Sequence, residues 1–294
     1  MQKLIVIIGP TASGKTNLAI NLAKKFNGEL VSADSRQIYR GMDIGTAKPT
    51  FPHYLIDIKN PDQDYSVGEY KKNAVNTINK ILASGKLPIL VGGTGLYISA
   101  VVNNLEIPEI KENKKLRAKI EKEIKEKDLD FVFKKLVAID PEAAYIVDLK
   151  NPRRVIRALE IAIVSGKKFS EQRKIGKPLY DVLEIGLNPL SEILRMRINK
   201  RIRLMIKSGL INEVKKLTKK YDYKCKSLDA IGYRETIDYL KKKISLEQAI
   251  TQMQNNTWHY AKRQITWFKK YNPKTHWVRK YKEAGRLVKK FLER

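Results

Sequence analysis

An apolar run, Leu4-Ile5-Val6-Ile7-Ile8, leads directly into Gly9-Pro10-Thr11-Ala12-Ser13-Gly14-Lys15-Thr16. This octapeptide fits the phosphate-loop pattern G-x-x-x-x-G-K-[S/T] at every specified position. The glycines let the backbone turn tightly, so that successive N–H groups point at a phosphate, while Lys15 adds a positive charge and Thr16 can hold Mg²⁺. Residues 15–26 have apolar side chains at helical spacing, and a helix there aims its positive dipole end at the same phosphate. The pattern favours a phosphate-binding loop over a purely structural glycine turn.

Two further strand ends carry polar residues that could meet this loop. Residues 30–33 read as a strand that ends at Asp34, and residues 87–91 as one that runs into Gly92-Gly93-Thr94-Gly95. In an open parallel sheet, ligands bind off the carboxyl ends of the strands. We therefore expect Asp34 and Thr94 to lie beside the phosphate loop. Each residue alone is more often a turn cap, but together on one edge they favour a functional site.

Local signals place most of the remaining elements. Capping boxes open two helices, one over residues 66–84 and one over residues 245–271. A strand is expected at residues 180–187, helices at 191–207 and 210–220 with a break at Gly209, and a short strand at 53–58. The last residues read as a short basic segment.

The stretch from about residue 103 to 177 is rich in Lys and Glu and has no strand signal. Leu116, Ile120 and Ile124 mark one helix, and the pairs Asp140-Pro141 and Asn151-Pro152 are typical of an N-cap and first helical position. The predicted fold is α/β: a phosphate-loop NTPase-like parallel sheet flanked by helices (residues 1–108 and 178–294), with an inserted all-helical subdomain (residues 109–177).

The charge is strongly one-sided. The chain has 59 Lys and Arg against 31 Asp and Glu, a net charge of +28. General charge enrichment would raise Glu along with Lys, so the imbalance favours a polyanionic partner such as nucleic acid. The single cysteine, Cys225, excludes an internal disulfide and a Cys-rich zinc site. We expect a cytoplasmic protein without a signal peptide or membrane span.

Several arginines are candidate anion ligands. Arg197 and Arg201 lie four residues apart on one helix face, a spacing more often found on solvated surfaces than at a diphosphate. Arg153 and Arg154 fall in a first helical turn, where the dipole disfavours cations, which points to an outside anion. Residues 262–268 interleave cations and aromatics, a mixture that suits RNA, although aromatic side chains there are more often core.

The sequence resembles the tRNA dimethylallyltransferase family over nearly its whole length, in the family's order. The matching pieces are GPTASGKT (9–16), DSRQIY (34–39), GMDIGTAKP (41–49), GGTGLY (92–97), NPRR (151–154), RALE (157–160), Arg197-Ile198 with Arg201 and Met205, AIGYRE (230–235) and RQITWF (263–268). Members with a C-terminal zinc finger need more cysteines, so a bacterial-type enzyme is implied.

The resemblance implies transfer of a dimethylallyl group from its diphosphate to the exocyclic amine of the adenosine just 3′ of a tRNA anticodon. It implies that the phosphate loop, Gly9 to Thr16, holds the donor diphosphate, with Mg²⁺ on Thr16. Asp34 is then the general base, Thr94 its partner, and Arg201, or else Arg197, the diphosphate-binding arginine.

By the same resemblance, the anticodon stem-loop would contact a set of residues spread along the chain: Asp34, Ser35, Arg36, Gln37, Thr94, Arg117, Arg153, Arg154, Arg157, Arg263 and Gln264. The expected acting unit is a monomer. Three alternatives stay open: a phosphate-loop kinase, a prenyltransferase for free adenine nucleotides, and a non-catalytic RNA-binding switch.

Overall fold

The computed structural model describes residues 1–108, 110, 112–172 and 175–294. The chain divides into a sheet unit, Met1–Val102 with Pro178–Arg294, and a helical unit, Asn103–Lys177. The predicted boundary at residue 109 lies outside the described residues, and the helical unit begins before it, at Asn103.

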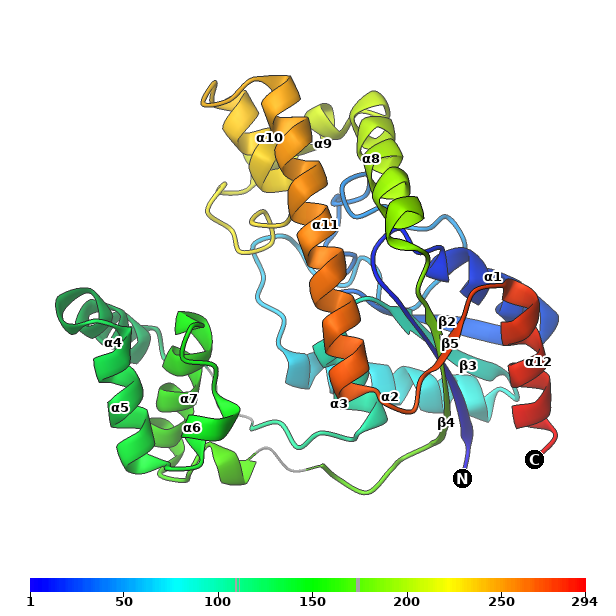
Figure 1. Ribbon diagram of the computed structural model, residues 1–294, viewed down its shortest axis with the longest axis horizontal. Coiled ribbons are helices and arrows are strands. Elements are labelled where there is room, and N and C mark those ends of the chain that lie inside the picture. Colours follow the sequence, from blue (N-terminus) through cyan, green and yellow to red (C-terminus); the bar gives the residue numbers. More distant parts are fainter. Residues whose placement is uncertain (109, 111, 173–174) are drawn as a thin grey trace. The chain divides into compact units, whose positions relative to one another are not determined.

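The sheet unit is built on five parallel strands in the order β2-β3-β1-β4-β5 (Figure 1). Their bounds are β1 Lys3–Ile8, β2 Gly28–Ala33, β3 Leu87–Gly92, β4 Asp181–Leu187 and β5 His276–Val278. Parallel neighbours need crossover connections, which the helices supply. The predicted α/β class is confirmed.

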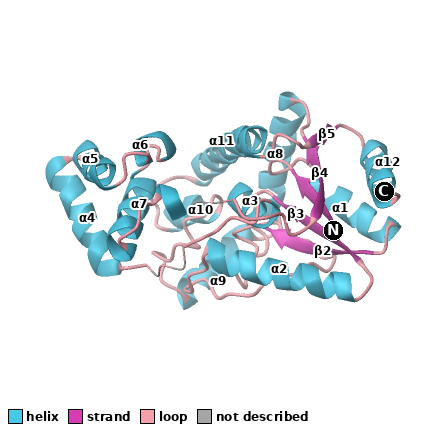
Figure 2. Cartoon of the chain, turned by 90° about the horizontal axis from the view of Figure 1, so that it is seen from below, coloured by secondary structure: helices cyan, strands magenta, loops and turns pink. Residues whose placement is uncertain are grey.

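Helices cover both faces of this sheet (Figure 2). On one face, α1 (Lys15–Lys25) and α12 (Tyr281–Leu292) pack against side chains of the strands. On the other face lie α2 (Val67–Ala83), α3 (Gly95–Val102) and the buried Phe268. Because both faces are buried, β1 reads as a continuous apolar run rather than an alternating one.

A second layer of helices follows β4. Its members are α8 (Ser191–Lys207), α9 (Leu210–Lys220), α10 (Tyr233–Leu240) and α11 (Leu246–Tyr271) (Figure 1). They share one apolar cluster with Ile38, Tyr39 and Met42. Gly209 separates α8 from α9 with a φ of 100°, and Ser245 with Gln248 forms the predicted capping box. Within the described ranges, no helix has the length and apolar character that crossing a bilayer requires.

The helical unit contains α4 (Lys114–Lys127), α5 (Leu129–Ile139), α6 (Ala143–Ile146), α7 (Pro152–Ser165) and a 3₁₀ turn (Ser170–Gln172). Asn151 caps α7 by accepting the Arg154 N–H, as predicted. The prediction for Asp140 is wrong. Its buried carboxylate accepts the N–H and hydroxyl of Ser170, both at 2.8 Å, and so ties the end of α5 to a distant turn.

The predicted strand at residues 53–58 is also wrong. Only Tyr54 pairs with the sheet, through backbone hydrogen bonds to Leu30 and Ser32 beside β2. Leu55 and Asp57 then take left-handed φ values of 64° and 56°, which end the extended backbone. The segment after residue 271, for which the sequence indicated only a short basic stretch, forms β5 and α12.

Candidate functional site

The strand register brings three loops to one edge of the sheet. Ile8 of β1 and Ala33 of β2 are both paired with Gly92 of β3. The next residues, among them Asp34, therefore leave the sheet side by side. A Cβ on Gly92 would lie 2.1 Å from the Ala33 carbonyl oxygen, so no side chain fits at this closely packed edge.

The phosphate loop turns through left-handed backbone at Ala12 (φ 61°) and Gly14 (φ 94°) and leads into α1. The Lys15 ammonium donates to the Pro10 carbonyl at 3.2 Å and so lies folded over the loop. The Ser13 hydroxyl is buried and has no hydrogen-bond partner among the described residues. Unpaired polar groups and a positive helix end are the features of an anion cradle.

Gln264 of α11 fastens this loop to the end of β3. Its side-chain oxygen accepts the Thr11 N–H at 2.8 Å, and its amide nitrogen donates to the Gly93 carbonyl at 2.8 Å. Gln264 is buried, which differs from the RNA contact suggested by the resemblance. The sequence contains no local sign of this role because the two partners lie 253 and 171 residues away along the chain.

Asp34 and Thr94 are close neighbours at the same edge. One oxygen of Asp34, Oδ1, accepts the N–H groups of Arg36 at 2.9 Å and Gln37 at 3.4 Å. No described residue donates to its other oxygen, Oδ2. The Thr94 hydroxyl accepts the Ser35 N–H at 3.0 Å, which joins the ends of β2 and β3. Asp34 therefore caps a turn and still keeps one carboxylate oxygen available.

Both α8 arginines reach the phosphate loop. Arg197 donates to the Ser13 carbonyl at 3.2 Å, and Arg201 contacts the Thr11 hydroxyl and the Thr46 carbonyl at 3.4 Å each. Their four-residue spacing alone indicated a solvated surface. The structure places both arginines at the phosphate loop instead of in solvent. The apolar side of α8 packs on the neighbouring helices, so the side that carries the arginines faces the loop.

These cations share a poorly solvated site. Burial lowers the pKa of the Lys15 ammonium to about 8; the Asp34 carboxylate opposes that shift and the Arg201 guanidinium adds to it. Burial also lowers the pKa of Arg201, against the effect of Asp34. A bound anion would offset the desolvation cost of the cations and reduce the repulsion between them.

We expect inorganic diphosphate to bind less tightly as the pH rises above about 8, because Lys15 loses its proton there. The same shift has a stability effect of opposite sign. The unfolded chain binds more protons at Lys15 between about pH 8 and its ordinary pKa of 10.5, so the free energy of unfolding should rise through that window. Calorimetric titration of diphosphate into the wild type and Lys15→Met across this range measures the first effect. A pH profile unchanged by Lys15→Met would contradict it.

A cavity of about 390 Å³ opens beside the loop, a size typical of small-molecule sites. Thr11, Asp34 and Arg201 form polar walls, and an apolar wall is made by Ile198, Ile202, Met205 and Met253. Tyr260 also lines it, and burial raises the pKa of its hydroxyl to about 12. Tyr260 could not be singled out from the sequence, because an aromatic residue on a long helix usually belongs to the core.

The remaining candidate RNA contacts differ in their availability. Arg36 donates to the carbonyls of Lys226 and Ser227, and the Gln37 amide contacts Ser32 and Thr46. The side chains of three other candidates are exposed: Arg153, Arg154 and Arg263.

Within the helical unit, Arg117 and Arg157 both pair with Glu160. Arg117 Nη2 lies 2.8 Å from the buried Glu160 carboxylate, which also accepts the Asn113 N–H at 2.7 Å. Glu160 holds the start of α4 against α7. The charge of these two arginines is thus partly compensated inside the unit, which the sequence pattern did not show.

These features define a phosphate-loop α/β protein whose cationic cradle and adjoining apolar wall suit a diphosphate joined to a small apolar group. Residues 37–271 match the family model described as IPP transferase, and residues 2–55 match one described as Isopentenyl transferase. The chain therefore belongs to the IPP transferase family, and the resemblance to tRNA dimethylallyltransferases is confirmed.

Individual relatives agree. A tRNA dimethylallyltransferase of Bacillus mycoides is 48% identical over 276 residues, covering 91% of this chain and 87% of the relative. The crystal structure of a full-length tRNA isopentenylpyrophosphate transferase from Bacillus halodurans matches with a TM-score of 0.73 at 39% identity, covering 100% of this chain and 96% of the other. The structure of a eukaryotic dimethylallyltransferase acting on tRNA matches with a TM-score of 0.80 at 31% identity, covering 95% of this chain and 74% of the other.

Proposed function

We propose that this chain transfers a dimethylallyl group from dimethylallyl diphosphate to the exocyclic N6 amine of the adenosine adjacent, on the 3′ side, to the anticodon in tRNA. The observation that carries the proposal is the meeting of the phosphate loop, Asp34 and Thr94 at one sheet edge, beside a cavity with an apolar wall. The family supports the choice of both substrates.

The reaction breaks the allylic C–O bond of the donor and forms a C–N bond to the adenosine. Diphosphate leaves with the electron pair of the C–O bond. Its growing charge can be neutralised by Lys15, Arg197, Arg201 and the loop N–H groups, which are fixed before the reaction begins.

The adenosine amine is a weak nucleophile and must lose a proton once it bonds to carbon. We propose that Asp34 Oδ2, the oxygen that takes no hydrogen bond from the described residues, accepts this proton. Thr94 would position the amine. Tyr260 lines the same cavity as Asp34. The adenine must leave its stacked position in the RNA to reach this cavity. The loss of stacking costs a few kcal/mol, which contacts to the RNA backbone offset.

Mg²⁺ fits the donor set at the phosphate loop. Among the described residues, no group of three or more His, Cys, Asp or Glu could hold a metal by itself. Mg²⁺ commonly keeps several waters and shares substrate phosphate oxygens with one or two protein oxygens. The Thr16 hydroxyl, at the start of α1, would be the protein ligand, and the ion would add positive charge at the departing diphosphate.

The charge of +28 supports a tRNA partner, and the exposed Arg153, Arg154 and Arg263 are the strongest candidates for its phosphates. Their proposed target is the anticodon stem-loop. The proposed acting unit is a monomer, because one chain supplies the cradle, Asp34 and Thr94. A tRNA substrate and the free Cys225 suit a cytoplasmic location.

We expect tRNA affinity to fall linearly with salt on logarithmic axes, with a slope of about −0.7 to −0.9 per phosphate contact, since counterions are released on binding. Arg154→Ala should reduce the magnitude of that slope by about 0.7 to 0.9, the share of one phosphate contact. Filter binding across a salt series measures both, and donor affinity of the same variant is the control. A flat response to salt would remove the phosphate-contact model.

The proposal is tested by incubating the protein with labelled dimethylallyl diphosphate or labelled ATP, with and without bulk tRNA. Label should pass from the prenyl donor to tRNA only. Transfer of phosphate from ATP would favour a phosphate-loop kinase, and prenylation of free AMP without tRNA would favour the nucleotide prenyltransferase. Binding of tRNA with no transfer at all would favour a non-catalytic switch.

A further inference from the structure

Three consecutive backbone N–H groups converge on one carboxylate outside the cradle. Glu213, on α9, accepts the N–H of Asp43 at 3.1 Å, of Ile44 at 2.7 Å and of Gly45 at 3.2 Å. The hydroxyl of the buried Tyr233 donates to the same carboxylate at 2.7 Å. Successive N–H groups of this kind form an anion-binding concavity, here filled by a side chain of the protein itself.

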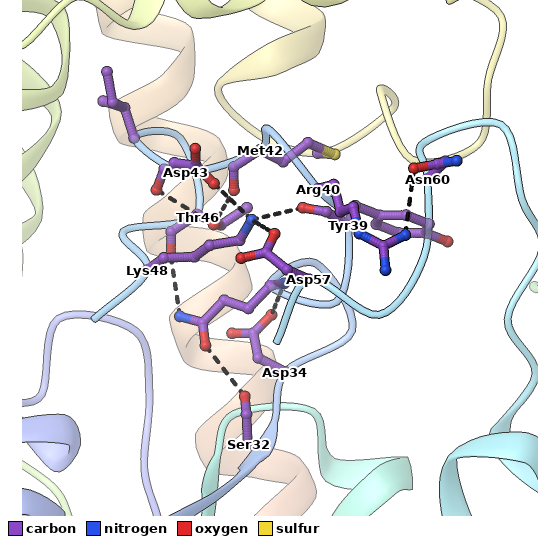
Figure 3. Close-up of polar contacts among 12 residues, drawn as sticks. Ser32, Asp34, Tyr39, Arg40, Met42, Asp43, Thr46, Lys48, Asp57 and Asn60 are labelled. Atoms are coloured by element: carbon purple, nitrogen blue, oxygen red, sulfur yellow. Dashed lines mark hydrogen bonds and ion pairs between the residues drawn. The ribbon is translucent and has the colours of Figure 1, made fainter. Parts of the chain in front are cut away.

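This arrangement fixes the segment that carries Thr46. Hydrogen bonds to an ionised acceptor are roughly twice as strong as neutral ones, so the three from the turn hold it firmly, and the fourth, from Tyr233, orients the carboxylate. Gly45 lies flat on the Tyr233 ring, where a Cβ would come within 2.4 Å of the ring. The same segment is also held by the Lys48 ammonium, which joins Asp43, Asp57 and the Tyr39 carbonyl (Figure 3).

The fixed turn presents its next carbonyl to the site. The Thr46 carbonyl accepts from Arg201 Nη2 at 3.4 Å and from the Gln37 amide at 3.3 Å. Arg201 has its other contact on Thr11 of the phosphate loop. Thr46 is thus the second of two supports that determine where a partly buried guanidinium points, and Glu213 determines where Thr46 lies.

We infer that Glu213 is a positioning residue for diphosphate binding, acting through the Thr46 carbonyl on Arg201. It does not touch the substrate. The inference rests on the proposed function only in taking the phosphate loop as the donor site. Were Glu213 merely a fastener between α9 and the turn, its loss would lower stability without depending on Arg201.

The test is a double-mutant cycle on the affinity for inorganic diphosphate, measured by calorimetry. Glu213→Gln keeps the side-chain size but can no longer serve all four donors as an ionised acceptor. We expect it to weaken diphosphate binding about tenfold in the wild-type background and not at all in Arg201→Ala. Tyr233→Phe, which keeps the ring against Gly45, should give a smaller loss with the same dependence on Arg201.

Glu247→Gln is the matched control, because Glu247 is exposed and pairs only at 3.7 Å with the exposed Arg203. It should leave diphosphate affinity unchanged. Equal losses from Glu213→Gln with and without Arg201, or no loss at all, would overturn the inference while leaving the donor site intact. If Glu213→Gln does not fold, Tyr233→Phe decides the same comparison. A wild-type protein that fails to bind diphosphate would overturn the proposed function and the inference with it.

Discussion

Asp34→Asn should lower the single-turnover rate of prenyl transfer by about 10²- to 10⁴-fold, the usual cost of losing a general base. Asparagine keeps an oxygen at the position of Oδ1, so the hydrogen bonds from the Arg36 and Gln37 N–H groups can persist. What it loses is the charge at Oδ2 that can take the proton of the adenosine amine. The rate is to be measured at saturating donor and tRNA.

The comparison with Asp34→Ala separates the two roles of this residue. Alanine removes the turn cap as well as the base, and capping losses cost about 0.5 to 2 kcal/mol of stability. Asp34→Asn should therefore unfold near the wild-type temperature, and Asp34→Ala below it. An asparagine variant that keeps more than about a tenth of the wild-type rate would leave Asp34 as a turn cap only.

The central strand–loop–helix could be predicted from sequence because its causes are local. The apolar run from Leu4 to Ile8, the loop glycines and Lys15 follow one another directly along the chain, and each determines the structure of its immediate neighbours. Parallel pairing then makes the position of Asp34 and Thr94 predictable, since strand ends in register share an edge. The capping box of Ser66 and Glu69 is equally local and is present as predicted.

Contacts between distant segments could not be predicted. Gln264 is hydrogen-bonded to Thr11 and Gly93, and Asp140 is hydrogen-bonded to Ser170. All of these partners lie far away along the chain, so the neighbouring sequence does not indicate them. Likewise, α12 is held by contacts at both ends: the Tyr281 hydroxyl donates to the Gly14 carbonyl, and Lys3 donates to the last carbonyls of the helix. This short basic sequence is stable as a helix because its apolar side chains pack on one face of the sheet.

The arginines of α8 show how a local rule can fail at a functional site. Two cations four residues apart repel each other slightly and usually face water. Here Arg197 faces the Ser13 carbonyl of the phosphate loop, and Arg201 faces the Thr11 hydroxyl of that loop and the Thr46 carbonyl. Arg201 is held there although burial lowers its pKa. A site kept electropositive in this way is ready to bind an anion.

Lys15→Ala should cost about 2 to 4 kcal/mol of transition-state stabilisation, by analogy with the loss of one fixed donor to a developing oxyanion. The ammonium is held over the loop by the Pro10 carbonyl, and its burial makes each charge interaction there stronger than in water. The loss should appear in kcat/KM for dimethylallyl diphosphate and in the Kd of inorganic diphosphate.

The Kd for tRNA should stay within about twofold in Lys15→Ala, because Lys15 is one positive charge among 59 and is folded onto the phosphate loop rather than exposed on a surface. Lys24→Ala, which removes an exposed lysine from the same helix, is the matched control and should change neither donor nor tRNA binding. If Lys15→Ala bound diphosphate with normal affinity, the donor site could not be at the phosphate loop. Equal losses for tRNA and donor would instead mean that the loop holds RNA phosphate, since only a shared site couples the two affinities in this way.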